Sequence, residues 1–229
     1  MSAITTTLLS GGTKIAAIYE LISIDVRREV NRIPHASLVL LDGDAAKRKF
    51  ALSDAAYFEP GKEIEIKLRY ESKTADTTLF KGPVIRHGVE ASAQGSLLRV
   101  EMKDAAVKLT QARKSMVFRE QSDDEAIGKL IRDGGLKPGT IDTTRPTHPQ
   151  IVQYHCSDWD FIVSRADIHG LLAVADDGEI AVRKVDLSAQ PKHKFDYGIG
   201  EIYNFEFELD AGSQYPAVKS SGWDIKKAE

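Results

Sequence analysis

The chain has 229 residues, of which 42% are hydrophobic and 28% charged, and its formal net charge is -3. This balance is typical of a globular protein with an apolar core, and the length allows one large domain or two small ones. The lack of a basic excess argues against a nucleic-acid-binding protein. The single cysteine, Cys156, excludes an internal disulfide framework.

The start of the chain carries no recognisable targeting signal. Residues 1–13 are rich in Ser, Thr and Gly and lack a basic stretch followed by an apolar run, so no signal peptide is predicted. No stretch approaches the roughly 18 apolar residues that a membrane helix requires. We therefore expect assembly in the cytoplasm, which the single cysteine also favours.

The first half of the chain alternates apolar and polar residues with a period of two. In residues 63–70 (EIEIKLRY) every even position is apolar and every odd position is charged, and residues 22–27 follow the same rule. Successive side chains of a strand point to opposite faces, so this pattern predicts half-buried strands. Residues 37–41 are apolar enough to be predicted as buried on both faces. Further strands are predicted at residues 79–89 and 96–102, with turns at residues 42–44, 60–61 and 94–95.

The middle of the chain changes to a helical pattern. Residues 122–125 (SDDE) form a predicted capping box, and apolar residues follow at helical spacing until Gly134. Residues 137–150 contain three prolines and are predicted to form a loop. A second helix is predicted to begin at Ser157 and to end at Gly170.

A hairpin is predicted after the second helix. Residues 171–175 and 180–185 flank Asp177 and Gly178, a pair that favours a type I′ turn. The alternation of the first half then returns, because Tyr203, Phe205 and Phe207 are separated by polar residues. This predicts another half-buried strand, and residues 217–223 are predicted to form one more.

These patterns predict a mainly β fold, a β-barrel interrupted by a small α+β insert. Residues 1–113 are expected to form the first part of the barrel, residues 114–199 the insert, and residues 200–229 the strands that complete the barrel. Large aromatic side chains of the insert and of the last segment are expected in the core: Trp159, Phe205, Phe207 and Trp223.

Two clusters have residue types that can carry out catalysis. Asp158 and Asp160 flank Trp159 and could act as a carboxylate pair. On a helix, residues two apart do not face each other, and capping accounts for both aspartates. His155 and Cys156 could form a nucleophile or half of a metal site, but neighbouring residues of a strand point apart, which favours a buried structural thiol.

Two acidic turns resemble calcium loops in composition only. Residues 42–44 (DGD) and 176–179 (DDGE) lack the ligand series of an EF-hand, and both lie where turns are expected. Neither a phosphate-binding glycine loop nor a nucleophile elbow occurs. The sequence therefore predicts no catalytic residue, no cofactor and no metal, and we expect a protein that is not an enzyme.

Ordered segments over nearly the whole chain resemble the VgrG-type spike and baseplate hub proteins of contractile injection systems. Each segment is short, and their common order makes the resemblance specific. The segments are REVNRIP (28–34), ASLVLLDG (36–43), FEPGKEI (58–64), LFKGPV (79–84), KDAAVKLT (103–110), RKS (113–115), VQY (152–154), SDWDF (157–161), RA (165–166), GLL (170–172), QY (214–215) and SGWD (221–224).

The resemblance implies a structural part of a phage tail, a type VI secretion system or an extracellular injection particle. Proteins of this kind are homotrimers that adapt a six-fold tail tube to a three-fold puncturing spike. The expected partners are two further copies of the chain, the hexameric tube protein, baseplate proteins, the spike tip and effector cargo. Nucleic acid is not expected, and a membrane would be met only through the spike of the released particle.

The chain departs from the family pattern in two respects. The second barrel, the OB-fold module and the β-helical spike have no counterpart in it. Residues 68–70 read Leu-Arg-Tyr where the family would have Leu-Gly-Tyr. Arg69 is therefore the candidate interface residue, although a solvated surface arginine explains it equally well. The alternative function is a cell-wall or carbohydrate-degrading module of a tail.

Overall fold

The computed structural model describes residues 4–15, 19–43, 49–70, 73–92, 95–198, 204–210, 212 and 215–219. The chain forms two compact units, residues 1–185 and residues 186–229.

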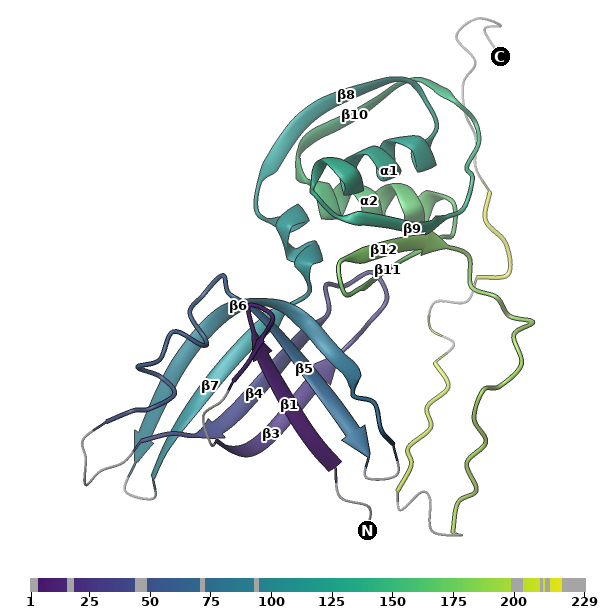
Figure 1. The fold of residues 1–229 in the computed structure, drawn as a ribbon. Helices are drawn as coiled ribbons and strands as arrows, with labels where there is room; N and C mark the ends of the chain where they lie inside the picture. Colours follow the sequence, from purple (N-terminus) through teal and green to yellow (C-terminus); the bar gives the residue numbers. More distant parts are fainter. Residues whose placement is uncertain are drawn as a thin grey trace, which may run out of the picture. The chain divides into compact units, whose positions relative to one another are not determined.

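A seven-stranded antiparallel sheet makes up the first half of the first unit (Figure 1). Its spatial order is β2-β1-β5-β6-β7-β4-β3, so the meander β5-β6-β7 lies in the middle. The strands are β1 (Ile4–Ser10), β2 (Thr13–Lys14), β3 (Glu20–Arg27), β4 (His35–Leu41), β5 (Glu63–Tyr70), β6 (Thr77–Ser92) and β7 (Gly95–Lys103).

The sheet curls around one apolar core. Ile64 and Ile66 of β5 are fully buried, as their even positions predict, and Leu38 and Leu40 of β4 are fully buried beside them. Phe58, on the segment before β5, covers the same core. The expectation that residues 37–41 are buried on both faces is wrong, because every second residue of β4 lies on the outer face and is only half-buried.

The sheet is open at β3. Within the described residues, β3 pairs only with β4, and no ladder joins it to β1 or β2. The Tyr19 hydroxyl, just before β3, donates to the carbonyl of Thr6 on β1 at 3.4 Å and links the two sides of the curled sheet. The described strands therefore form a curled, barrel-like sheet that is not closed by a ladder, with β3 at one edge and β2 at the other.

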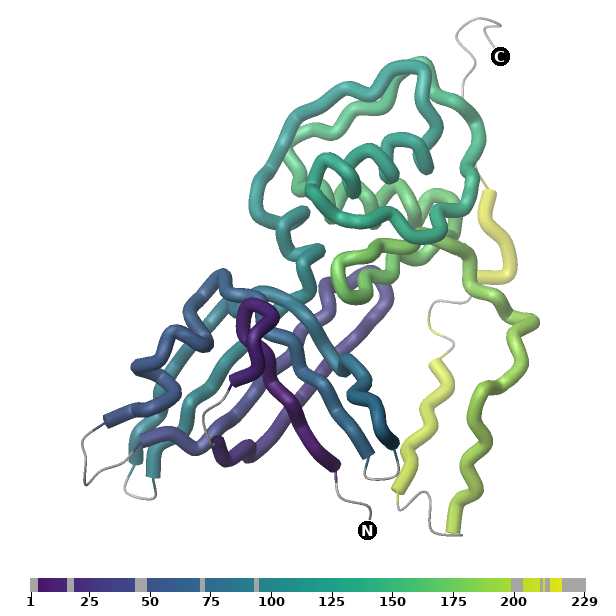
Figure 2. The backbone as a smooth tube through the Cα atoms, in the orientation of Figure 1, coloured from purple at the N-terminus to yellow at the C-terminus, as the bar shows by residue number. Residues whose placement is uncertain are grey.

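The second half of the first unit is the α+β insert (Figure 1). Helices α1 and α2 lie between the two-stranded ribbon β8–β10 and the three-stranded sheet β11-β12-β9, as the tube in Figure 2 also shows. The elements are η1 (Ala105–Thr110), β8 (Arg113–Gln121), α1 (Asp123–Asp133), β9 (Lys137–Ile141), β10 (His148–Ser157), α2 (Asp158–Ile168), β11 (Leu172–Asp176) and β12 (Glu179–Arg183).

Local hydrogen bonds set the helix starts and the hairpin where the sequence predicts them. The backbone N–H of Ser122 donates to Glu125 Oε2 at 2.9 Å, and the N–H of Asp160 donates to Ser157 Oγ at 3.1 Å. Asp177 and Gly178 have φ angles of 49° and 81° between the paired residues of β11 and β12. Two positive φ angles in a two-residue loop are those of the predicted type I′ turn.

Residues 137–150 are not a continuous loop, which corrects the expectation from their prolines. Lys137–Ile141 forms β9, which runs parallel to β12, and His148 begins β10. β9 is an edge strand of its sheet, where the missing N–H of Pro138 is tolerated.

The second unit differs from the sequence expectation. Residues 204–210 form no helix or strand, and Phe205 and Phe207 are 62% and 74% exposed. Their expected core positions are therefore wrong for this structure: without a strand there is no sheet face on which to bury them. Trp223 and Tyr203 lie outside the described residues. The division of the chain at residues 113 and 199 stays a prediction.

Candidate functional site

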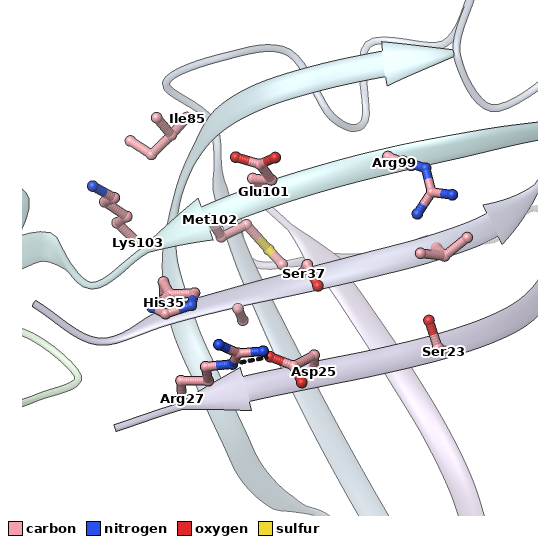
Figure 3. Close-up of a pocket in the computed structure, with 12 residues that line it drawn as sticks. Ser23, Asp25, Arg27, His35, Ser37, Ile85, Arg99, Glu101, Met102 and Lys103 are labelled. Carbon is pink, nitrogen blue, oxygen red and sulfur yellow. Dashed lines mark hydrogen bonds and ion pairs between the residues drawn. The ribbon is translucent and has the colours of Figure 1, made fainter. Parts of the chain in front are cut away.

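A trough of about 670 Å³ lies on the outer face of the curled sheet. It is lined by residues of β3, β4 and β7 together with Ile85 of β6 (Figure 3). The strands place polar side chains there because their alternate residues fill the core on the other face, as Leu38 and Val100 do.

Most charges of the trough are already paired. Asp25 and Arg27 of β3 form an ion pair at 3.1 Å. Arg99 pairs with Glu90 at 3.0 Å, and Glu101 pairs with Arg86 at 3.3 Å. Among the described residues, the Lys103 ammonium at the end of β7 has no ion pair, and His35 lies beside it in register.

The trough is a polar surface on the outer face of the sheet. It is open, and its two carboxylates are each held by an arginine, so neither is a free general base. The described residues contain no group of three His, Cys, Asp or Glu side chains that could hold a metal ion. None of the described helices is long and apolar enough to cross a membrane.

Arg69 does not belong to the trough. It lies on β5 opposite Thr5 of β1, and its Nε is 3.6 Å from Asp76 Oδ1. The Arg69 side chain is 41% exposed and lines a separate pocket of about 240 Å³ beside Leu68 and Tyr70. Its interface role stays a prediction.

The Asp158–Trp159–Asp160 cluster is part of the insert's packing. Trp159 is 5% exposed and belongs to the core between the helices and the strands. Asp160 accepts a hydrogen bond from the Ser157 hydroxyl at 2.6 Å. Asp158 is buried as well, and its carboxylate accepts hydrogen bonds from Lys114 Nζ at 2.5 Å and Gln153 Nε2 at 2.9 Å.

His155 and Cys156 lie in an irregular part of β10. The register with β8 shifts between Gln153 and Cys156, and His155 has a φ of 45°. Cys156 is half-buried rather than fully buried. The two side chains form no cluster with other metal-binding groups in the described residues.

The acidic turns serve as local hydrogen-bond acceptors. Asp42 accepts from the N–H groups of Leu52 and Ser53 at 3.0 and 2.7 Å. Burial would raise the pKa of Asp42, but these bonds and one from the Ser53 hydroxyl bring the pKa below its usual value. Burial and the charge of Asp176 raise the pKa of Asp177.

Sequence reasoning missed a charged cluster around Asp123. This buried carboxylate accepts from Arg165 Nε and Nη2 at 2.5 and 2.9 Å, and lies 2.7 Å from His169 Nε2 and 3.4 Å from His148 Nε2. Burial would raise the pKa of Asp123, but the hydrogen bonds of Arg165 and His169 and the charge of Arg165 lower it. The cluster ties α1, α2 and β10 together.

A second missed group joins the sheet to the insert inside the first unit. Asn31, in the left-handed conformation, donates its N–H to Ala173 O at 2.8 Å and accepts from Ala173 N at 2.9 Å. Arg28 pairs with Asp176 at 3.1 Å. Asp104 accepts from the N–H groups of Ala106 and Gly178, and burial raises its pKa. Arg28 and Asn31 both belong to the REVNRIP segment that the sequence singled out.

Comparison with known proteins gives a family and a fold. The family described as the Alg8 N-terminal domain matches residues 1–229. No curated protein matches the sequence. A 43 kDa tail protein of prophage MuSo2 from Shewanella oneidensis superposes with a TM-score of 0.59 at 12% identity, over 80% of this chain and 54% of that one.

Two further solved structures share the arrangement. A tail protein from Neisseria meningitidis MC58 has a TM-score of 0.58 at 14% identity, over 82% of this chain and 53% of its own. The third is an Escherichia coli component of the type VI secretion system that is described as similar to the bacteriophage T4 tail proteins gp27 and gp5. It has a TM-score of 0.56 at 13% identity, over 76% of this chain and 48% of its own.

These similarities establish a common fold. The chain spans about half the length of the solved proteins it matches, at 54%, 53% and 48%. The fold is that of phage-tail and type VI secretion proteins, which confirms the predicted mainly β, hub-like architecture with a small α+β insert.

Proposed function

We propose that this chain, which belongs to the Alg8 N-terminal domain family, is a structural hub component of a contractile injection machine and not an enzyme. The observation that carries the proposal is the fold shared with prophage tail proteins and a type VI secretion component over 76–82% of the chain. Fold alone does not specify function. The charged sites described above add to the argument, since each is paired in a way that suits structure rather than turnover.

In this proposal three copies assemble around the particle axis and connect a six-fold tube to a three-fold spike. Each copy would supply tube-binding surface from its curled sheet. The outer trough of β3, β4 and β7 and the Arg69 pocket are candidate contact surfaces of the sheet. Baseplate proteins, the spike tip and effector cargo would be further partners. The particle would assemble in the cytoplasm before release or injection.

The test is the mass and symmetry of the assembled complex. The full chain, co-produced with the tube protein encoded beside it, is expected to give trimers that cap hexameric tubes, measured by light scattering and electron microscopy. A monomer that never associates with the tube, but hydrolyses peptidoglycan or a polysaccharide with turnover, would overturn the proposal in favour of the hydrolase alternative.

Arg69→Glu tests the contact surface within this proposal. We expect it to reduce the yield of capped tubes while the thermal unfolding of the chain stays unchanged, because an inverted charge at a subunit contact weakens association without disturbing the core. Arg32→Glu is the matched control, since Arg32 also forms an exposed ion pair, with Glu29 at 3.2 Å, and lines neither the trough nor the Arg69 pocket. Equal yields for Arg69→Glu and wild type would remove Arg69 from the interface.

A further inference from the structure

The ribbon β8–β10 has two edges that could accept another strand. Within the described residues it is a two-stranded sheet, and β8 and β10 pair only with each other. The helices support its inner face (Figure 1), and no described strand of the first unit forms a ladder with either of its edges. Unpaired strand edges present N–H and C=O groups that can pair with another chain.

The two edges differ in how well they are protected. β10 contains Pro149, which lacks an N–H, and a register shift between Gln153 and Cys156 with His155 at a φ of 45°. Proline and bulges are devices that block strand addition. β8 has no proline, and among the described residues its backbone from Arg113 to Arg119 bonds to no backbone group outside the ladder with β10. The edge of β8 is therefore the open one.

The exposed side chains of β8 favour a negatively charged partner. Arg113, Val117 and Arg119 lie on the outer face of β8, and all three are exposed. Among the described residues neither arginine forms an ion pair, whereas Lys114 of the inner face is bound to Asp158. The other inner residues are Met116, half-buried, and Phe118, buried. The outer face of the edge thus offers two cations without an ion pair among the described residues, and the inner face offers the half-buried Met116.

The outer face continues as an apolar patch over β10. Val117 is 47% exposed and lies opposite Val152, which is 50% exposed. Tyr154 is 80% exposed, just before the bulge. Tyrosine and arginine around an apolar centre are the residues that dominate protein–protein contacts.

We propose that the free edge of β8 binds an extended segment of a protein partner in which acidic and apolar residues alternate. The partner's backbone would extend the ribbon by one strand, the mode of recognition known as β-augmentation. Its carboxylates would lie beside Arg113 and Arg119, and its apolar side chains would lie on the inner face beside Met116. The two arginines are about 20 Å apart along an extended strand, so the segment needs about seven residues.

The experiment uses the full chain and three capped heptapeptides. The first alternates Glu and Val and begins and ends with Glu, the second has Lys in place of Glu, and the third is the first with alternate backbone nitrogens methylated. Binding is measured by fluorescence anisotropy, and hydrogen exchange reports on the amides of residues 113–119. We expect the Glu peptide to bind and to protect these amides, and the Lys and methylated peptides to bind at least about tenfold more weakly.

Variants assign the binding to this edge. The double variant Arg113→Glu, Arg119→Glu is expected to bind the Glu peptide at least about tenfold more weakly and to prefer the Lys peptide. Arg183→Glu is the matched control, because Arg183 is exposed on β12 and, within the described residues, has no ion pair. It is expected to leave binding unchanged.

Three outcomes would overturn the proposal. They are no binding of the Glu peptide at about 1 mM, binding without protection of residues 113–119, and equal binding by the double variant and wild type. The measurement needs neither a trimer nor a tube. Absence of peptide binding would therefore not contradict the proposed hub function. Likewise, a chain that forms no trimer could still bind the peptide.

Discussion

β5 and residues 204–210 carry the same sequence pattern but end in different environments. Ile64 and Ile66 of β5 are fully buried, whereas Phe205, Phe207 and Leu209 are 62%, 74% and 86% exposed. β5 is hydrogen-bonded on both sides, to β1 and to β6. Residues 204–210 form no strand.

The difference shows what an alternating pattern specifies. It specifies which side chains share a face if the segment becomes a strand. Burial of that face requires neighbouring strands, which only the rest of the fold can supply. Among the described residues of the second unit, Phe205 has one aromatic contact, with Tyr197 at a centroid distance of 5.2 Å.

The largest expected difference in stability between the two segments appears when one apolar residue in each is replaced by alanine. Ile66→Ala is expected to lower the free energy of unfolding by about 2–5 kcal/mol, because it leaves a cavity in the core. Phe207→Ala is expected to change it by less than about 0.5 kcal/mol. Urea unfolding of the full chain measures both. Similar losses would show that Phe207 is buried in solution, as its sequence pattern predicts.

The same comparison extends to carboxylates. Asp123→Asn is expected to cost about 2–3 kcal/mol, because it weakens charged hydrogen bonds to Arg165 and His169. Glu208→Gln, on the exposed segment, is the control and should leave unfolding unchanged. A loss with Glu208→Gln that matched that of Asp123→Asn would contradict the comparison.

The contribution of Asp123 should depend on pH. Its pKa is lowered in the folded state, so its stabilisation is present in full above the unfolded value of about 3.9 and is lost as pH falls through the lower folded value. The difference in unfolding free energy between wild type and Asp123→Asn should therefore shrink below about pH 4. A constant difference from pH 7 to pH 2 would exclude the carboxylate as its source.

Two glycines at positive φ give a smaller contrast. Gly178→Ala is expected to destabilise the first unit by about 1 kcal/mol, because its φ of 81° in the hairpin is unfavourable for a residue with a Cβ. Gly198 has a φ of 86° but lies in the second unit. Gly198→Ala should therefore leave the main thermal transition in place. Equal shifts in melting temperature would mean that the two units unfold together.

The smallest effect is expected from removing the second unit. A chain of residues 1–185 should be soluble and unfold in the same cooperative transition as the full chain, within about 0.5 kcal/mol. Circular dichroism and size-exclusion chromatography measure this. Aggregation of the shortened chain would instead support the prediction that residues 200–229 complete the sheet.

The sequence by itself determined the features that depend on near neighbours. The alternation of β5 identified its buried face, Ser122 and Ser157 marked the helix starts, and Asp177 with Gly178 marked the hairpin. Each relies on hydrogen bonds or side-chain directions within a few residues, so the local sequence contains the information. Together with the ordered resemblance, these were enough to predict the mainly β, hub-like fold.

Only the tertiary structure decided the features that join distant segments. Asp123 meets Arg165 and His169 across 42 and 46 residues, and Asn31 meets Ala173 across 142. Asp158 is buried because Lys114, 44 residues away, offsets its charge. Burial of Phe207 would likewise need a neighbouring strand, and residues 204–210 do not themselves determine whether one is present. The free energy of burying a charge or an apolar face is set by what packs against it, and distant residues supply that partner.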